Sequence, residues 1–250
     1  METELKDKTV GEMVAENYRT ADVFKRYGID FCCGGKKPLS KVCEEKGIDR
    51  ENLEIELSHI GYAEKIPSQN FAQWEIDFLI NYIINTHHAY INRSIPVMTQ
   101  YIEKAANVHV HAYKETLTVH ALWSEIVDEI TSHMLKEEQV LFPFIKQLVS
   151  ANRHHSKLNP PSFATVKNPI YMMEHEHNAV GKLVKEIQRI TSNYSTPPEA
   201  CNTYKVAYAK LNEFAEDLFM HIHLENNILF PRAIVLENKM KQAGEFTSLN

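Results

Sequence analysis

Glycine is scarce in this 250-residue chain: only 8 occur, which argues against a glycine-rich α/β fold or a β-sandwich. A basic surface is also missing, because the formal net charge is −6, so the composition predicts no nucleic-acid binding. Long hydrophobic runs are absent too. The longest apolar stretches, such as residues 78–84, are far too short to span a bilayer, so we expect no membrane partner. Helix is the structure that this composition favours.

Cysteine is equally sparse, and the four that occur do not form a disulfide scaffold in a chain of this length. Two of them, Cys32 and Cys33, are neighbours, and a disulfide between neighbours would be strained. Residues 1–13 are charged and lack the apolar core of a secretory signal. We therefore expect a protein of the reducing cytoplasm.

The residue pattern divides the chain into a small helical module and a larger helical domain. Residues 1–60 contain a capping-box pattern, Thr9 to Glu12, and a glycine-rich turn over residues 30–38 that carries both neighbouring cysteines. Residues 61–70 are predicted as a linker, residues 71–240 as the larger domain and residues 241–250 as a C-terminal tail.

The larger domain is predicted to be an antiparallel four-helix bundle, so the fold class is all-α. Amphipathic helices are predicted over residues 71–105, 110–151, 168–193 and 199–240. The last two connections carry paired prolines and polar residues, which end helices. Helices of this length with short connections pack as antiparallel neighbours.

The bundle sequence repeats itself. His133-Met-Leu-Lys-Glu137 recurs as His221-Ile-His-Leu-Glu225, and both the histidine and the glutamate recur after 88 residues (221 − 133 and 225 − 137). A histidine on the preceding helix recurs after 89 residues (177 − 88). The repeat predicts two helical hairpins related by a pseudo-two-fold axis, with equivalent half-sites facing each other in the core.

Helical periodicity selects which polar residues point inward, at 100° per residue. Each helix places one histidine on its apolar face, and two helices add a glutamate one turn later. His87 falls on a flank, whereas His175 and His223 point away, and Val140 falls on the inward stripe of the second helix. The inward set is His88, His133, Glu137, His177, His221 and Glu225.

A single inward histidine is more often a hydrogen-bonded core residue than a metal ligand. Buried glutamates are rarer, because an unpaired buried charge costs several kcal/mol. Histidine and carboxylate ligands without thiolates suit iron or manganese, and residues i and i+4 share one helix face. We therefore predict two non-haem iron ions with carboxylate and oxo or hydroxo bridges, leaving roughly one position per ion for a small molecule.

Other residues near the site have weaker predictions. Glu129 and Glu176 fall near the inward faces, where they would act as bases, exchange ligands or line a channel; the alternative is an edge position that reaches solvent. Pro143 and Pro231 are predicted to kink their helices just past the site.

The paired motifs HMLKEEQVLFP and HIHLENNILFP, together with HHAYINRSIP, resemble the hemerythrin-like domain. With the Asp-Phe-Cys-Cys-Gly-Gly turn in front, residues 9–236 resemble the repair of iron centres (RIC) family. The resemblance implies a di-iron protein that restores iron–sulfur clusters after oxidative or nitrosative stress, with the same six ligands. In the two ambiguous pairs, His87 or His88 and His175 or His177, it favours the second residue. It also implies a channel and activity role for Glu129 and Glu176.

The cysteine turn has two interpretations. Cys32 and Cys33, beside Lys36 and Lys37, would hold thiolates of lowered pKa for electron transfer, iron hand-over or nitrosyl exchange. Alternatively, the turn is structural and its thiols are incidental. Of the remaining cysteines, Cys43 and Cys201 are predicted to be structural.

The leading functional hypothesis is a repair protein whose partners are damaged iron–sulfur proteins and whose small ligands are nitric oxide or O₂. The first alternative is an enzyme that reduces nitric oxide to nitrous oxide with electrons relayed by Cys32 and Cys33. A second is a sensor that binds O₂ or nitric oxide reversibly. An iron store is disfavoured, because no cage-forming oligomer is indicated, although the resemblance makes a homodimer plausible.

Overall fold

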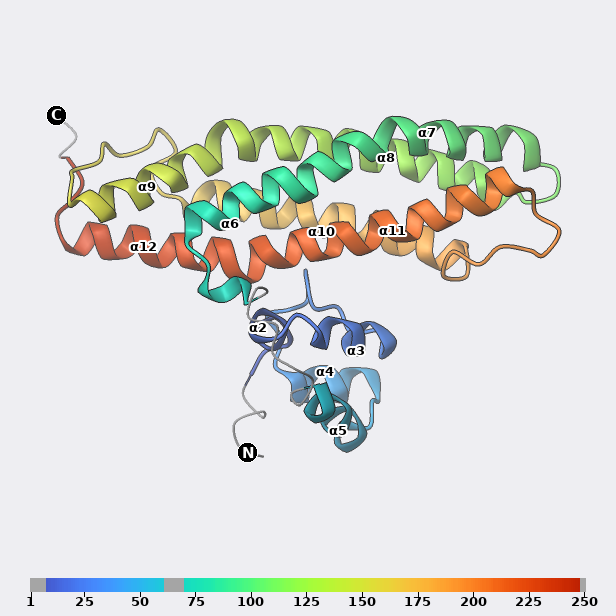
Figure 1. Ribbon diagram of the computed structural model, residues 1–250, viewed down its shortest axis with the longest axis horizontal. Coiled ribbons are helices and arrows are strands. Elements are labelled where there is room, and N and C mark those ends of the chain that lie inside the picture. The colour runs from blue at the N-terminus through green and yellow to red at the C-terminus, as the bar shows by residue number, and fades with distance from the viewer. Residues whose placement is uncertain (1–7, 61–69, 248–250) are drawn as a thin grey trace.

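The computed structural model describes residues 8–60 and 70–247. A long helical bundle forms most of the molecule, and a small helical module lies against one side of it (Figure 1). The all-α fold expected from the sequence is confirmed. Within the described ranges, no helix combines the length and apolar character that a membrane crossing requires.

The N-terminal module consists of α2 (Val10–Glu16), α3 (Thr20–Arg26), α4 (Leu39–Lys46) and α5 (Arg50–Ile60). The predicted capping box is present: the Thr9 hydroxyl accepts from the Glu12 backbone N–H at 3.2 Å, and the Glu12 carboxylate accepts from the Thr9 backbone N–H at 2.8 Å. The module has its own core, which includes the fully buried side chains Val10, Phe24, Leu39 and Leu53. Of the predicted linker, only Asn70 lies within the described residues.

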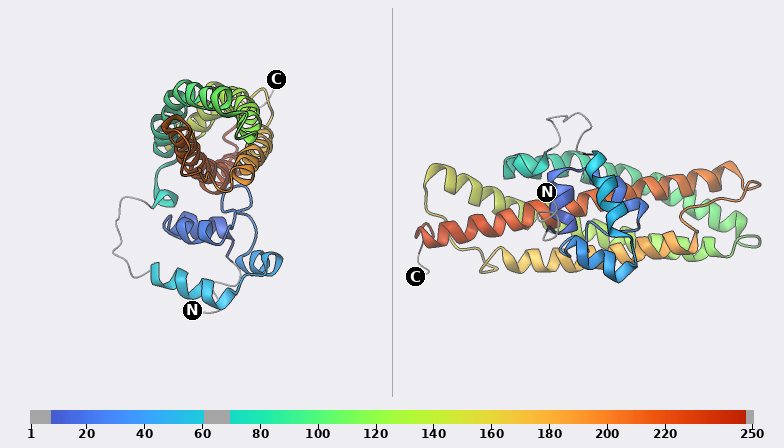
Figure 2. Two further views of the ribbon diagram at one scale, coloured as in Figure 1. Left: turned by 90° about the vertical axis from the view of Figure 1, so that its right-hand side faces the viewer. Right: turned by 90° about the horizontal axis from the view of Figure 1, so that it is seen from below.

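The bundle is a closed ring of four long helical segments, seen end-on in the left view of Figure 2. A short 3₁₀ turn, η2 (Phe71–Gln73), precedes it. Segments α7 and α8 contact each other, α8 contacts α10, and α11 contacts both α10 and α7, which closes the ring. In chain order the segments are α6 (Ile76–Ile83), η3 (Ile84–His88) and α7 (Ala89–His109); α8 (Glu115–Lys136), η4 (Glu137–Leu141) and α9 (Phe142–His154); α10 (Lys167–Ile190); and α11 (Asn202–Leu224), η5 (Glu225–Leu229) and α12 (Phe230–Gln242).

Three of the four segments contain a turn of π-helix, which the sequence did not predict. In η4 the Phe142 N–H donates to the Glu137 carbonyl, and in η5 the Phe230 N–H donates to the Glu225 carbonyl, so each bond spans five residues. A proline, Pro143 or Pro231, is the second residue after each of these turns, and it lacks the N–H that an ordinary α-helical bond would need. Wide turns of this kind are frequent at functional sites.

The wide turn after Glu137 changes which residues face the core. A π-turn accommodates one additional residue, so a phase of 100° per residue no longer holds beyond it. The prediction that Val140 points inward is wrong: 48% of its surface is exposed, and Leu141, which is 1% exposed, is buried instead. His87 was expected on a flank, yet the structure buries it beside His88.

The N-terminal module docks on the bundle through Asn227 of η5. The Asn227 amide donates to the carbonyls of Phe31 and Cys32, at 3.3 and 3.2 Å. A Cβ atom on Gly35 would lie 2.9 Å from the Asn227 amide oxygen and 2.4 Å from the Phe31 carbonyl oxygen, so this position has no room for a side chain. The contact places the cysteine turn against the same stretch of bundle that carries Glu225.

Candidate metal centre

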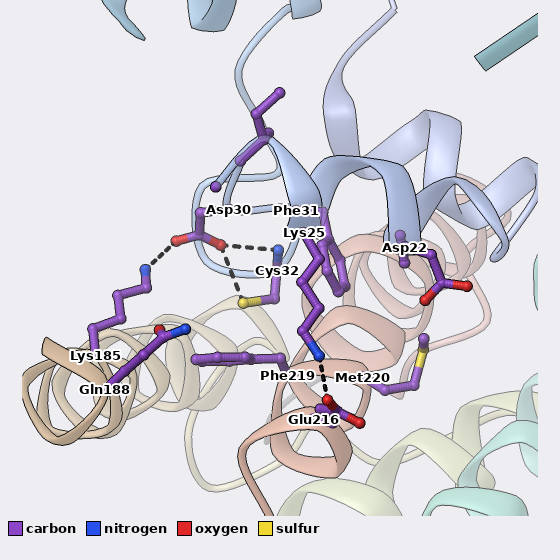
Figure 3. Close-up of a pocket in the computed structure, with 13 residues that line it drawn as sticks. Asp22, Lys25, Asp30, Phe31, Cys32, Lys185, Gln188, Glu216, Phe219 and Met220 are labelled. Carbon is purple, nitrogen blue, oxygen red and sulfur yellow. Dashed lines mark hydrogen bonds and ion pairs between the residues drawn. The ribbon is translucent and has the colours of Figure 1, made fainter. Parts of the chain in front are cut away.

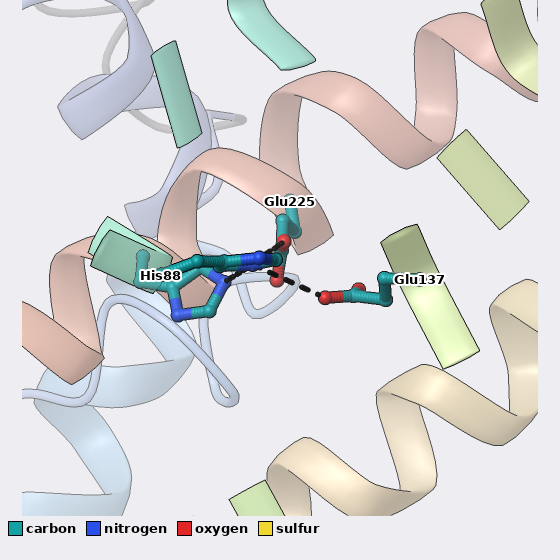
Figure 4. Close-up of side chains that lie close together, drawn as sticks. His88, Glu137 and Glu225 are labelled. Carbon is teal, nitrogen blue, oxygen red and sulfur yellow. Dashed lines mark hydrogen bonds and ion pairs between the residues drawn. The ribbon is translucent and has the colours of Figure 1, made fainter. Parts of the chain in front are cut away.

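All six side chains predicted as ligands meet in the middle of the bundle. They form two groups of four donors: one contains His88 and His221, and the other contains His133 and His177. Glu137 and Glu225 belong to both groups, and within each group the donor atoms lie within 4.8 Å of one another. Figure 4 shows the shared carboxylates converging on His88. Each of the six residues is at most 1% exposed.

The Nε2 atoms of the histidines face each other in pairs. The distance is 3.1 Å between His88 and His221, and 2.9 Å between His133 and His177. Glu225 lies 2.9 Å from Nε2 of His221 through one oxygen and 3.1 Å from Nε2 of His177 through the other. Its two oxygens therefore reach one histidine in each group, which is the arrangement that a bridging carboxylate requires.

The outer nitrogens of three ligand histidines contact groups that accept hydrogen bonds. Nδ1 of His88 lies 2.7 Å from the Glu138 carboxylate, and Nδ1 of His133 lies 2.9 Å from the Glu176 carboxylate. Nδ1 of His177 lies 2.8 Å from the Asn226 amide oxygen. These partners fix the proton on Nδ1, so a neutral ring directs its Nε2 lone pair into the centre.

The donor set fits cations. With Nδ1 protonated on His133 and His177, two lone pairs face each other at 2.9 Å, and only a proton or a metal ion between them removes the repulsion. Both oxygens of the fully buried Glu137 lack a hydrogen-bond partner. A buried carboxylate without hydrogen bonds is costly unless a cation neutralises it.

The histidines and glutamates also set one another's protonation. Burial disfavours a charged His88, but the nearby carboxylates of Glu137 and Glu225, 3.5 and 3.9 Å from its Nε2, outweigh burial and raise the pKa of His88 to about 10. The pKa of His133 is likewise raised to about 10, since the charge of Glu137 outweighs its burial. Although burial opposes it, the neighbouring histidines hold the pKa of Glu225 well below its usual range. Without metal, protons on the imidazoles take the place of the cations.

Comparison with known proteins identifies the family. Residues 6–61 match a family model described as a Domain of Unknown function (DUF542), and residues 79–233 match the hemerythrin HHE cation binding domain. The chain is 34% identical over 229 residues to the iron-sulfur cluster repair protein YtfE of Yersinia pestis, covering 92% of this chain and 97% of the relative. The iron-sulfur cluster repair protein YtfE of Yersinia pseudotuberculosis matches with the same identity and coverage. The chain belongs to the iron–sulfur cluster repair family.

Of the two glutamates predicted near the metal ligands of this repair-family chain, only Glu176 lies at the centre. Glu176 contacts His133, and this hydrogen bond lowers the pKa of Glu176 to about 2; a salt bridge from Lys136 adds to the effect. Glu129 lies on the exposed side of α8, so the prediction that it falls near the inward face is wrong. It takes the edge position reaching solvent that was the alternative interpretation. His175 is exposed, as its helical phase predicted.

Sequence reasoning missed several polar groups around the centre. Glu138 and Asn226 directly follow the two ligand glutamates and are themselves 88 residues apart (226 − 138), so the repeat could have identified them. His87 is buried, and its Nδ1 lies 2.9 Å from Asp217. His223, expected to face away from the core, is 1% exposed because the N-terminal module covers it, and its ring packs edge-on against Phe31.

In this family member, the two lysines beside the cysteine turn do not act on its thiols in the way that the sequence predicted. Lys36 and Lys37 form ion pairs with Glu174 and Glu45, so neither lysine stabilises a thiolate. The hydrogen bond to Cys33, followed by burial, raises the pKa of Cys32 well above its usual range. The prediction of a lowered thiol pKa is therefore wrong for Cys32. In the metal-free protein its thiol keeps its proton.

The other two cysteines differ from each other. Cys43 is buried on α4, whereas Cys201 is exposed and is the N-cap residue of α11. A hydrogen bond from the Tyr204 backbone N–H and a second from His109, at 2.9 Å from the sulfur, lower the pKa of Cys201 to about 7. Cys201 is therefore the more ionised thiol at neutral pH.

Adding Fe²⁺ to the metal-free protein at neutral pH is expected to release about two protons per chain, one each from His88 and His133. Both histidines have a raised pKa, so each carries an additional proton at neutral pH that a metal ion must displace. Apparent metal affinity should therefore increase with pH up to about 10. Calorimetry in buffers of different ionisation enthalpy measures the release. The exposed His175→Gln variant should release the same number, and metal uptake without protons would contradict the prediction.

Proposed function

We propose that this protein binds two iron ions between its four helices and uses them to restore damaged iron–sulfur clusters. The observation that supports this best is the sharing of Glu137 and Glu225 between both donor groups. Two groups that share both carboxylates suit a pair of neighbouring ions better than one ion. The relatives named iron-sulfur cluster repair proteins support the repair role.

The donor chemistry supports iron as the metal. Four imidazoles and two carboxylates, without a thiolate, suit an ion of intermediate softness such as Fe²⁺. Bound iron supplies exchangeable coordination positions and a metal that a damaged cluster lacks. The chain itself orients the imidazoles through Glu138, Glu176 and Asn226, and excludes water by burying all six donors.

Iron donation is tested directly with the intact protein loaded with ⁵⁷Fe. We expect the labelled iron to move to a client [4Fe–4S] enzyme that has lost cluster iron, and the client's activity to return in proportion. Mössbauer spectra of both proteins after separation measure the transfer. Recovery of client activity with unlabelled iron only would contradict donation from this centre.

Glu176→Gln is expected to weaken iron binding by about ten- to a hundredfold, because an amide no longer draws the Nδ1 proton of His133 and leaves that ligand less basic. Competition with a chelator of known affinity measures the change. Glu129→Gln is the matched control, since Glu129 is exposed and lies outside the centre. Equal losses in both variants would show that Glu176 has no specific role.

Reduction of nitric oxide is a second candidate function, which one contact favours. The sulfur of Cys33 lies 3.6 Å from the backbone carbonyl oxygen of the ligand His177 and 3.8 Å from the sulfur of Cys32. A thiol pair beside the centre suits a reaction in which two nitric oxide molecules take up two electrons and two protons to give nitrous oxide and water. Sustained nitrous oxide formation with excess reductant would support this enzyme, and a single turnover would exclude it.

A further inference from the structure

The cysteine turn brings three potential metal donors together outside the bundle centre. The carboxylate of Asp30, the sulfur of Cys32 and the sulfur of Cys33 all lie within 4.8 Å of one another. One oxygen of Asp30 accepts from both the Cys32 backbone N–H, at 3.0 Å, and the Cys32 thiol, at 3.1 Å. These bonds hold the side chains of Asp30 and Cys32 together, as Figure 3 shows.

We propose that Asp30, Cys32 and Cys33 form a second metal site, which holds one thiophilic divalent ion and serves as the point where iron passes to or from the bundle. This inference rests on the proposed iron-donating function. The two sulfurs are 3.8 Å apart. Two thiolates bound tetrahedrally at about 2.3 Å from one ion would be separated by about 3.8 Å, so the ion fits without moving the sulfurs apart.

The charges around these donors balance. Binding replaces the two thiol protons, which leave to solvent, with bonds from the two thiolates to the ion, and no electron transfer is involved. Two thiolates and one carboxylate carry three negative charges, and a divalent ion leaves one. Lys185 forms an ion pair with the other oxygen of Asp30, and its positive charge compensates the remainder. The occupied site is therefore neutral.

The position of the site suits the transfer of iron to or from the bundle. Asp30 and Cys32 line a cavity of about 250 Å³ between the module and the bundle (Figure 3). On the other side, Cys33 packs on α10: a Cβ atom on Gly181 would lie 3.3 Å from its sulfur. Three protein donors leave the fourth tetrahedral position for an exchangeable ligand. The site thus lies between an accessible cavity and the helix turn that carries His177.

The test uses the full chain with both bundle sites filled with iron, so that added metal must bind elsewhere. Cobalt(II) is the probe, because thiolate ligands give it a charge-transfer band in the near ultraviolet. All samples carry Cys201→Ser, since Cys201 with His109 at 2.9 Å is another thiol that metal could reach. We expect one further equivalent of cobalt to bind with a thiolate band.

Three variants show which residues bind the cobalt that gives this band. Cys33→Ser should abolish the band. Asp30→Asn should weaken cobalt binding at least about tenfold, because loss of even an outer-shell partner of a metal ligand typically costs that much affinity. Cys43→Ser, which alters a buried thiol of the module core, should leave it unchanged. Circular dichroism and bundle iron content verify folding, and Cys33 is preferred to Cys32 because it is only half-buried.

Absence of the band in the parent, or its persistence in Cys33→Ser, would overturn the second site. The same samples are assayed for bundle iron and for repair of a damaged client. If the parent protein shows no band but repairs its client normally, this site is rejected and the proposed function stays intact. A band in a protein that cannot donate iron supports the site and rejects the proposed function.

Discussion

In the proposed two-iron centre, Glu225→Ala is expected to remove both irons, reducing the iron content from about two per chain to nearly none. The carboxylate belongs to both donor groups, and its two oxygens contact His221 on one side and His177 on the other. Its loss therefore takes a ligand from each ion at once and also removes one of the two charges that neutralise them. Inductively coupled plasma mass spectrometry and Mössbauer spectra of the purified variant measure the outcome.

The histidine variants provide the comparison. His133→Ala and His221→Ala each remove a ligand from one donor group only, so each should lower iron content, but less than Glu225→Ala does. His175→Ala is the matched control, because His175 is an exposed histidine on the helix that carries His177. Full iron occupancy in all of the ligand variants would mean that the metal binds elsewhere.

The sequence predicted the bundle from helical periodicity. It predicted the polar residues of the core because burial of charge is costly. A glutamate on an apolar stripe needs a cation, and finding two of them 88 residues apart made coincidence improbable. The same repeat placed His133 and His221 in equivalent positions, and the structure brings both to one centre. Local periodicity and the free-energy cost of buried charge were therefore sufficient to predict the bundle and the polar residues at its centre.

The features that the sequence did not predict depend on departures from regular helix and on contacts between distant segments. The π-turn that starts at Glu137 changes the helical phase, which is why Leu141 rather than Val140 is buried. Nothing in the local sequence shows that His223 will be covered by Phe31, nearly two hundred residues earlier. The pairing of Lys36 with Glu174 is equally non-local, so the electrostatics of the cysteine turn could not be predicted.

Replacing Cys32 and Cys33 together with alanine is expected to leave bundle iron unchanged and to abolish repair. Neither cysteine belongs to the two donor groups in the bundle, so the centre keeps all six donors. The turn itself is held by groups that the substitutions do not alter, because Asn227 bonds to the backbone carbonyls of Phe31 and Cys32. What the variant loses is the pair of sulfurs 3.8 Å apart beside the turn that carries His177.

Iron content and the rate of client reactivation, measured on the same preparation, separate these effects. Cys43→Ala is the control, since it removes a buried thiol from the same module but lies on α4, away from the bundle. If the double variant repairs as fast as the parent, the turn only docks the module, and iron leaves the bundle by another route. If it instead loses bundle iron, the module stabilises the centre, because the contact of Cys33 with the His177 carbonyl is then needed to hold that ligand in place.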